Sequence, residues 1–225
     1  MSKPPVAIIG DSGTGKSSAI ETLPPERTCI LNTENKPLPM RNFNKFKNVM
    51  LIDYKKIIST LDALTTPEME AKYDYVVMDS FTSTCETVYR YSNKINNGYE
   101  VWGQYNEMII DILIKLKKLK QQVFIIALPE QKAEQFGETK SYARIKGKEL
   151  KYGFFEKELA VVLYTSPIYD DDSGEMLDVE LDYKPNKKNS AKAPRGLFEV
   201  NPKNDALAIA KAIKSYYEGE TNEEN

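Results

Sequence analysis

Apolar runs alternate with amphipathic stretches along most of the chain. Short apolar runs that end at turn-forming residues predict buried strands at residues 6–9, 28–32, 48–53, 73–80 and 121–128. Other stretches lie between these runs and place apolar side chains at helical spacing, which predicts helices packed on a sheet at residues 55–64 and 107–120. The alternation predicts an α/β fold with a mostly parallel central sheet flanked by helices.

The pattern changes after the fifth predicted strand, because residues 130–158 are polar and mixed in charge. Residues 159–169 and 175–184 flank a turn-forming Asp-Asp-Asp-Ser-Gly segment and predict a C-terminal β-hairpin. The C-terminal apolar stripe predicts an amphipathic helix. We predict one domain over residues 1–217, followed by an acidic flexible tail at 218–225.

The absence of histidine narrows the chemistry more than any other feature of the composition. It excludes Ser-His-Asp and Cys-His catalysis and every zinc site that contains histidine, and it leaves carboxylates, lysine and Mg²⁺. Cys29 and Cys85 fall in predicted secondary structure and are expected to be core residues. No apolar run reaches membrane-spanning length, so we expect a cytoplasmic protein without a membrane partner. The net charge of −2 attracts no nucleic acid globally, so DNA contact requires local basic patches.

Residues 10–17 match the phosphate-binding loop pattern G-x-x-x-x-G-K-[ST] at every fixed position. The loop follows an apolar run and precedes a helix-compatible stretch, which is the context that the pattern requires. Backbone N–H groups of such a loop surround phosphate oxygens, the lysine reaches the outer phosphates and the final hydroxyl binds Mg²⁺. The predicted nucleotide-binding residues are Gly10, Ser12, Gly13, Thr14, Gly15, Lys16, Ser17 and Ser18.

Two acidic residues at strand ends are candidates for the chemistry of phosphate cleavage. Asp79 ends a buried apolar run, so a parallel sheet brings its carboxylate beside the loop, where Asp79 and Ser17 are the predicted Mg²⁺ ligands. Glu34 follows the strand at 28–32 and is the predicted base for an attacking water, because histidine is absent. Glu34 and Lys16 are therefore the predicted catalytic residues. Asp74 and Glu130 are the reserve candidates for the base.

Several of these segments carry a resemblance to a known family. "GDSGTGKSS" at 10–18, "LNTE" at 31–34 and "YVVMDS" at 75–80 together resemble the RecA-like class of P-loop ATPases. "WGQYNEM" at 102–108 and "AKAPRG" at 191–196 are similar to a bacteriophage branch of that class, the Sak-type ATP-binding proteins associated with single-strand annealing and recombination.

The resemblance implies an ATPase that uses ATP and Mg²⁺, in which Glu34 activates water and Asp79 binds the metal. It also implies a homo-oligomer, either a ring or a filament, that binds single-stranded DNA and has a single-strand-binding protein as a further partner. A phage-encoded chain would act in the cytoplasm of the host cell. One position departs from the class, because RecA-like chains usually end the fifth strand with a polar sensor residue. Here either Glu130 or Gln131 substitutes, or sensing is weaker.

Two polar segments hold the remaining candidates. Residues 184–195 contain five basic residues and no acidic residue, and they form either a solvated loop or, by the resemblance, a source of trans-acting fingers. The finger candidates are Lys192 and Arg195. Residues 130–158 interleave lysines with aromatic residues, a mixture suited to phosphate contact and base stacking, although six glutamates dilute it. The DNA-binding candidates there are Arg144, Lys146 and Lys148.

Two other functions stay open at this point. A small-molecule P-loop kinase usually places its Asp strand directly beside the loop strand and carries an arginine-rich lid, whereas here two predicted strands intervene in the sequence and Arg is sparse. A nucleotide-switched scaffold with negligible hydrolysis differs from the ATPase only if Glu34 is not catalytic. We predict the Mg²⁺-dependent, RecA-like ATPase.

Overall fold

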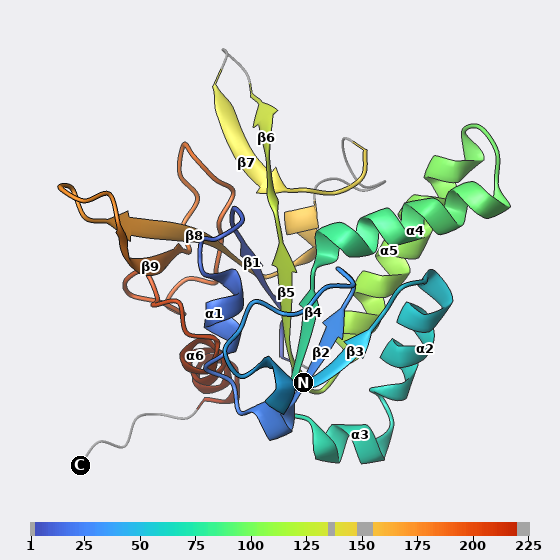
Figure 1. The fold of residues 1–225 in the computed structure, drawn as a ribbon, viewed down its shortest axis with the longest axis horizontal. Helices are drawn as coiled ribbons and strands as arrows, with labels where there is room; N and C mark the ends of the chain where they lie inside the picture. Colours follow the sequence, from blue (N-terminus) through green and yellow to red (C-terminus); the bar gives the residue numbers. More distant parts are fainter. Residues whose placement is uncertain (1–2, 135–137, 148–154, 220–225) are drawn as a thin grey trace.

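The computed structural model describes residues 3–134, 138–147 and 155–219 of the chain. They form an α/β fold around a seven-stranded sheet in the order β3-β2-β4-β5-β1-β8-β9, which confirms the predicted fold class (Figure 1). Within this sheet the pairs from β3 to β8 are parallel, and β8 and β9 pair antiparallel. The strands are β1 (Val6–Ile9), β2 (Thr28–Asn32), β3 (Lys47–Met50), β4 (Tyr75–Asp79), β5 (Gln122–Ala127), β8 (Val161–Tyr169) and β9 (Met176–Asp182).

Helices cover both faces of this sheet. One face carries α2 (Tyr54–Ala63), α4 (Phe81–Ile95) and α5 (Glu100–Lys118), and the other carries α1 (Lys16–Ile20) and α6 (Ala206–Glu218) (Figure 1). Alternate residues of each buried strand serve the two cores: in β1, Ala7 and Ile9 face α4 and α5, whereas Val6 and Ile8 face α1 and α6. Burial on both faces explains why these strands are continuous apolar runs in the sequence.

Short polar residues fix where the main helices begin. Asp53, Ser80 and Asp205 are N-caps, and their side chains accept hydrogen bonds from backbone N–H groups three residues later. Because Ser80 directly follows β4, its cap starts α4 at the edge where Asp79 lies, so the chain leaves the sheet immediately after the acidic residue.

The sequence pattern did not predict one short helix and one hairpin. Residues Pro67–Lys72 form a short helix, α3, and the polar segment after β5 forms an antiparallel hairpin of β6 (Pro129–Ala133) and β7 (Thr139–Ala143) that projects from the sheet edge (Figure 1). Apart from the buried Ala143, the residues of the two hairpin strands are half-buried or exposed, so the strands lack the apolar alternation that identifies a strand. The predicted hairpin of β8 and β9 is confirmed, as is the C-terminal helix.

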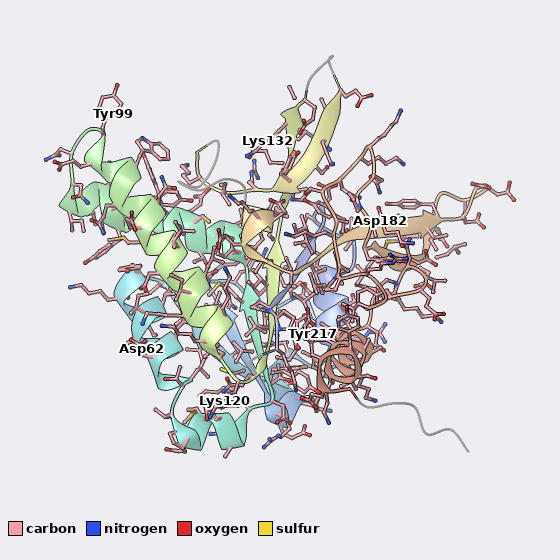
Figure 2. The ribbon with its side chains drawn as sticks, turned by 180° about the vertical axis from the view of Figure 1, so that it is seen from behind. Asp62, Tyr99, Lys120, Lys132, Asp182 and Tyr217 are labelled. Carbon is pink, nitrogen blue, oxygen red and sulfur yellow. The ribbon has the colours of Figure 1, made fainter. Side chains whose placement is uncertain are left out.

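Both cysteines are free and buried, as expected for core residues. Helices α4 and α5 extend as a pair beyond the sheet, and Figure 2 shows Tyr99 at the far end of this pair, where its side chain is almost fully exposed. Within the described ranges, no helix combines the length and apolar character needed to cross a membrane.

Candidate functional site

The carboxyl ends of four parallel strands meet at one edge of the sheet. The register pairs Asn32 of β2 with Asp79 of β4, Asp79 with Ile126 of β5, and Ile9 of β1 with Ala127 of β5. This register brings the end of β1, where the phosphate-binding loop begins, to the same edge as Asp79 and as the chain that leads into Glu34. Parallel pairing therefore gathers the predicted site from segments far apart in the sequence.

Two glycines shape the loop that joins β1 to α1. Gly13 and Gly15 have φ values of 83° and 85°, a left-handed conformation that side-chain-bearing residues rarely adopt. The loop folds back on itself, because Lys16 Nζ donates to the Asp11 carbonyl oxygen at 2.5 Å. Helix α1 has only five residues, so its dipole is small and the backbone N–H groups and Lys16 supply most of the attraction for phosphate.

A pocket of about 590 Å³ opens above this loop. The carboxylates of Glu34 and Asp79 and the ammonium groups of Lys16 and Lys36 all line it. Six of the eight predicted nucleotide-binding residues also line it, namely Ser12, Gly13, Gly15, Lys16, Ser17 and Ser18. The other two, Gly10 and Thr14, line a second pocket, which Ser12 also borders. The structure thus brings Lys16, Ser17, Asp79 and Glu34 into one cavity.

Asp79 is the most strongly perturbed acidic group of this cavity. The pKa of its carboxyl group is raised from 3.8 to about 6, chiefly by burial and also by the charge of Glu34, while Lys16 and Lys36 oppose the shift. Among the described residues, no hydrogen bond reaches either the Asp79 carboxylate or the Ser17 hydroxyl. These two free oxygen groups fit Mg²⁺, which is bound by one or two protein ligands together with substrate phosphates and water. No cluster of three acidic, cysteine or histidine residues offers another metal site in the described part of the chain.

Lys16 lies against these acidic groups. Burial lowers the pKa of its ammonium group, and the nearby carboxylates of Asp79, Asp11 and Glu34 oppose that effect. A partly desolvated ammonium group interacts more strongly with an incoming phosphate than a fully hydrated one does. The position therefore suits the contact with outer phosphates that the sequence predicts.

Glu34 does not stand alone at the end of β2. Lys36 Nζ lies 2.5 Å from Glu34 Oε2, and Lys36 was not among the residues that the sequence pattern singled out. Asn32 is fully buried and bonds both sides of the intervening turn: its Nδ2 donates to the Lys36 carbonyl oxygen at 2.9 Å, and its Oδ1 accepts from the Glu34 N–H at 3.1 Å. The turn passes through Asn35, whose φ of 55° is left-handed.

Two residues from the C-terminal third hold the loop, and no local pattern identifies them. Asn204 Nδ2 donates to the Gly15 carbonyl oxygen at 2.7 Å. Thr165 on β8 shares a hydrogen bond of 2.8 Å with Thr14. Both contacts join residues more than 150 positions apart, so only the folded chain reveals them.

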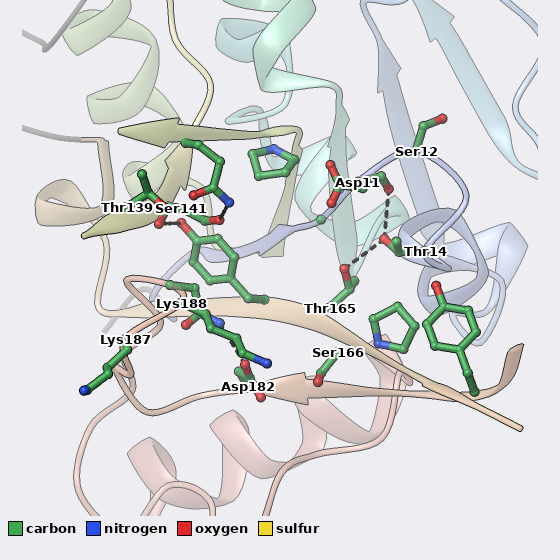
Figure 3. Close-up of a pocket in the computed structure, with 17 residues that line it drawn as sticks. Asp11, Ser12, Thr14, Thr139, Ser141, Thr165, Ser166, Asp182, Lys187 and Lys188 are labelled. Atoms are coloured by element: carbon green, nitrogen blue, oxygen red, sulfur yellow. Dashed lines mark hydrogen bonds between the residues drawn. The ribbon is translucent and has the colours of Figure 1, made fainter. Parts of the chain in front are cut away.

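The second pocket, of about 630 Å³, lies between the loop, the β6–β7 hairpin and the segment after β9 (Figure 3). Figure 3 shows Lys187 and Lys188 beside Asp182 on one rim of this pocket. Asp182 accepts hydrogen bonds from Asn189 at 2.7 Å and from Asn186 at 3.2 Å, so its charge is engaged in holding the basic segment. Neither lysine has an ion pair among the described residues.

Neither reserve candidate for the base joins the nucleotide pocket. Asp74 precedes β4 at the opposite edge of the sheet, where Arg27 donates two hydrogen bonds to its carboxylate and lowers its pKa. Glu130 lies on β6, and its Oε2 atom is 3.9 Å from Lys132 Nζ. Gln131 lines the second pocket and donates to Ser141, so neither polar residue after β5 stands where a sensor would reach the nucleotide pocket.

The finger candidates also lie outside the nucleotide pocket. The backbone of Lys192 pairs with Val162, burial lowers the pKa of its side chain, and the nearby carboxylates of Glu156 and Glu158 oppose that effect. Arg195 is exposed: its carbonyl oxygen accepts a hydrogen bond from Tyr216, and its guanidinium group has no ion pair or hydrogen bond among the described residues. Of the two, Arg195 has the freer guanidinium group for reaching another molecule.

The predicted DNA-binding residues are spread over a different surface. Lys146 Nζ lies 5.3 Å above the ring of Tyr89, and its backbone N–H donates to Tyr105, so Lys146 is held against the α4–α5 pair. Arg144 is exposed and follows β7, with its N–H bonded to the Leu128 carbonyl oxygen. Lys148 lies outside the described residues.

A family model described as an AAA domain matches residues 2–193. Among solved structures, the chain is similar to a KaiC-like protein from the hyperthermophilic archaeon Pyrococcus horikoshii OT3, with 12% identity and a TM-score of 0.47 over 79% of this chain and 77% of that one. A search of curated protein sequences gave no significant match.

Proposed function

Since the chain belongs to the AAA domain family, we propose that it binds ATP with Mg²⁺ and hydrolyses the terminal phosphate. The observation that carries this proposal is the meeting of Lys16, Ser17, Asp79 and Glu34 in one pocket at the carboxyl edge of the sheet. Each supplies one of the functions that phosphoryl transfer to water requires.

The roles follow from the chemistry of the four groups. The loop N–H groups and Lys16 bind the phosphates, while Ser17 and Asp79 would hold Mg²⁺, which would neutralise charge that develops on the phosphate oxygens. Glu34 accepts the proton of the attacking water. Glu34 follows β2 and Asp79 ends the neighbouring strand β4, so parallel pairing brings the base and the metal ligand to one pocket.

The strand order speaks against the kinase alternative. Strand β5 lies between β1, which leads into the loop, and β4, which ends in Asp79. In a small-molecule kinase of the usual arrangement these two strands are direct neighbours. The position of Glu34 in the pocket favours hydrolysis over the switch alternative, which lacks a base.

Two variants and one control test the proposal in a steady-state ATPase assay with Mg²⁺. Lys16→Ala is expected to lose tight ATP binding, whereas Glu34→Gln keeps ATP bound and loses most turnover. Asp74→Asn is the matched control, because Asp74 lies at the opposite edge of the sheet, and it is expected to turn over at the wild-type rate. If Glu34→Gln hydrolyses ATP at the wild-type rate, Glu34 is not the base.

We further propose that the protein acts as a homo-oligomer, a ring or filament in which a basic residue of one subunit reaches the ATP of the next. Arg195 is the stronger candidate for this finger, since its side chain is exposed and without a described partner, and Lys192 is the weaker one. The expected result is ATPase activity per chain that rises with protein concentration. Subunits carrying Arg195→Ala, mixed with subunits carrying Glu34→Gln, recover part of that activity only if the finger acts in trans.

The last part of the proposal is single-stranded DNA binding in phage recombination or annealing, with DNA stimulating hydrolysis and with a single-strand-binding protein as a partner. The support is local charge: Lys187 and Lys188 stand on the rim of the second pocket without described ion pairs. The expected result is salt-sensitive binding of a labelled oligonucleotide that Lys187→Glu with Lys188→Glu weakens more than the control Lys55→Glu with Lys56→Glu on α2. No salt-sensitive binding by the wild type at low ionic strength would remove DNA from the proposal.

A further inference from the structure

The ion pair between Lys36 and Glu34 lies inside the nucleotide pocket, and the proposed base therefore meets an ammonium group before any substrate arrives. We propose that Lys36 is a second phosphate-binding lysine, which holds Glu34 while the site is empty and moves to the terminal phosphate when ATP binds. This inference rests on the ATP hydrolysis proposed above and adds its regulation: the same lysine distinguishes ATP from ADP and releases the base.

The turn between the two residues is constructed so that both side chains enter one cavity. Asn32 has no exposed surface, and its two amide atoms bond the backbone of Glu34 and of Lys36, one on each side of Asn35. The backbone carbonyl oxygen of Asn32 accepts a hydrogen bond from the Leu51 N–H group, which connects the turn to the segment after β3. A fully buried polar side chain that satisfies the backbone on both sides of a turn fixes its conformation.

The Lys36 side chain is much more exposed than the carboxylate that it contacts. The side chain of Lys36 is 61% exposed, whereas the Glu34 side chain is only 21% exposed, so the lysine lies on the solvent side of the base. The charge of Lys36 lowers the pKa of both Asp79 and Lys16, which means that it already lies within electrostatic reach of the groups that would surround the phosphates.

The terminal phosphate of ATP carries more negative charge than one carboxylate, so it competes for the ammonium group of Lys36. Once Lys36 leaves, Glu34 Oε2 regains the lone pair with which it accepts a proton. The water oxygen then forms a bond to the terminal phosphorus, the bond from that phosphorus to the bridging oxygen breaks, and the water proton passes to Glu34. The products are ADP and inorganic phosphate. ADP lacks the terminal phosphate, so Lys36 stays on Glu34 when ADP is bound.

The alternative is an ion pair at the rim of the pocket that never contacts the nucleotide. Ion pairs with one exposed partner contribute little to stability, so a stability measurement does not separate the two cases. Nucleotide selectivity does separate them, because only a lysine that contacts the terminal phosphate affects ATP and ADP differently.

The test measures affinity by calorimetry in Mg²⁺ buffer for ADP and for an ATP analogue with a nitrogen in place of the β,γ-bridging oxygen. Lys36→Ala is expected to weaken the analogue by about tenfold, the effect of one charge-assisted hydrogen bond, and to leave ADP affinity within about twofold. Lys36→Arg is expected to restore most of the analogue affinity, because it keeps the charge. The control Lys55→Ala, on the exposed side of α2, is expected to change neither affinity.

A double-mutant cycle completes the test. Glu34→Gln is expected to strengthen binding of the analogue, since Lys36 no longer has to leave a carboxylate, and to strengthen it less in the Lys36→Ala background. Equal losses for both nucleotides in Lys36→Ala, or no loss for either, would overturn the role of Lys36. If the wild type hydrolyses ATP and Glu34→Gln does not, such a result rejects this inference alone; a wild type that does not hydrolyse ATP rejects the proposed function instead.

Discussion

The buried carboxyl group of Asp79 leads to a prediction in which loss of function brings a gain in stability. Asp79→Asn keeps the shape of the side chain and removes its charge. Burial raises the pKa of Asp79 from 3.8 to about 6, and each unit is worth about 1.4 kcal/mol, so ionising this group costs the folded protein about 3 kcal/mol at neutral pH. The variant is expected to recover up to about that amount, which corresponds to a rise in Tm of roughly 6–12 °C for a chain of this size.

The raised pKa of Asp79 sets the sign of the pH dependence of stability. Between pH 3.8 and about 6 the folded protein binds more protons at Asp79 than the unfolded chain does, so the contribution of Asp79 to stability falls as pH rises through this window and is constant above it. The advantage of Asp79→Asn is therefore fully present at pH 7.5 and nearly absent at pH 4.

The assay is denaturant or thermal unfolding at both pH values in buffer without Mg²⁺ and with a chelator, because a bound cation would favour the ionised form. Asp171→Asn, in the exposed turn between β8 and β9, is the control and is expected to stay within about 0.5 kcal/mol of wild type. Equal stability of Asp79→Asn and wild type at pH 7.5, or a gain of the same size at pH 4, would refute the reasoning. With Mg²⁺ the same variant is expected to lose ATP hydrolysis.

Two further predictions concern the contacts that hold the phosphate-binding loop. Gly10→Ala places a Cβ atom 1.9 Å from Thr165 Oγ1, so this variant is expected to lower both the Tm in thermal unfolding and the affinity in a nucleotide titration. The control is Gly103→Ala in α5, whose Cβ atom meets nothing within 4 Å and which is expected to stabilise the protein by about 0.5–1 kcal/mol. Asn204→Ala removes the hydrogen bond to the Gly15 carbonyl oxygen and is expected to cost about 1 kcal/mol of stability and to weaken nucleotide binding in the same titration; unchanged affinity would mean that this hydrogen bond does not support nucleotide binding.

Local patterns in the sequence determined the loop and the α/β class. The loop is a contiguous pattern whose glycines are required by backbone geometry at the residues themselves, and Gly13 and Gly15 do adopt the left-handed conformation. The spacing of apolar side chains also predicts buried strands and amphipathic helices, which is why β1, β5 and the β8–β9 hairpin lie where the pattern predicts them. The β6–β7 hairpin was missed because its strands bury little apolar surface.

The tertiary structure alone decided which side chains complete the site. Strand order is a property of long-range pairing, so the position of β5 between β1 and β4 has no local signature. The same holds for Thr165 and Asn204, which reach the loop across more than 150 residues. Lys36 lies two residues from Glu34 in the sequence, yet a turn held by a buried amide is what directs it back onto the carboxylate instead of into solvent. Such contacts form only when the folded backbone brings the two residues together, and their spacing in the sequence does not predict this.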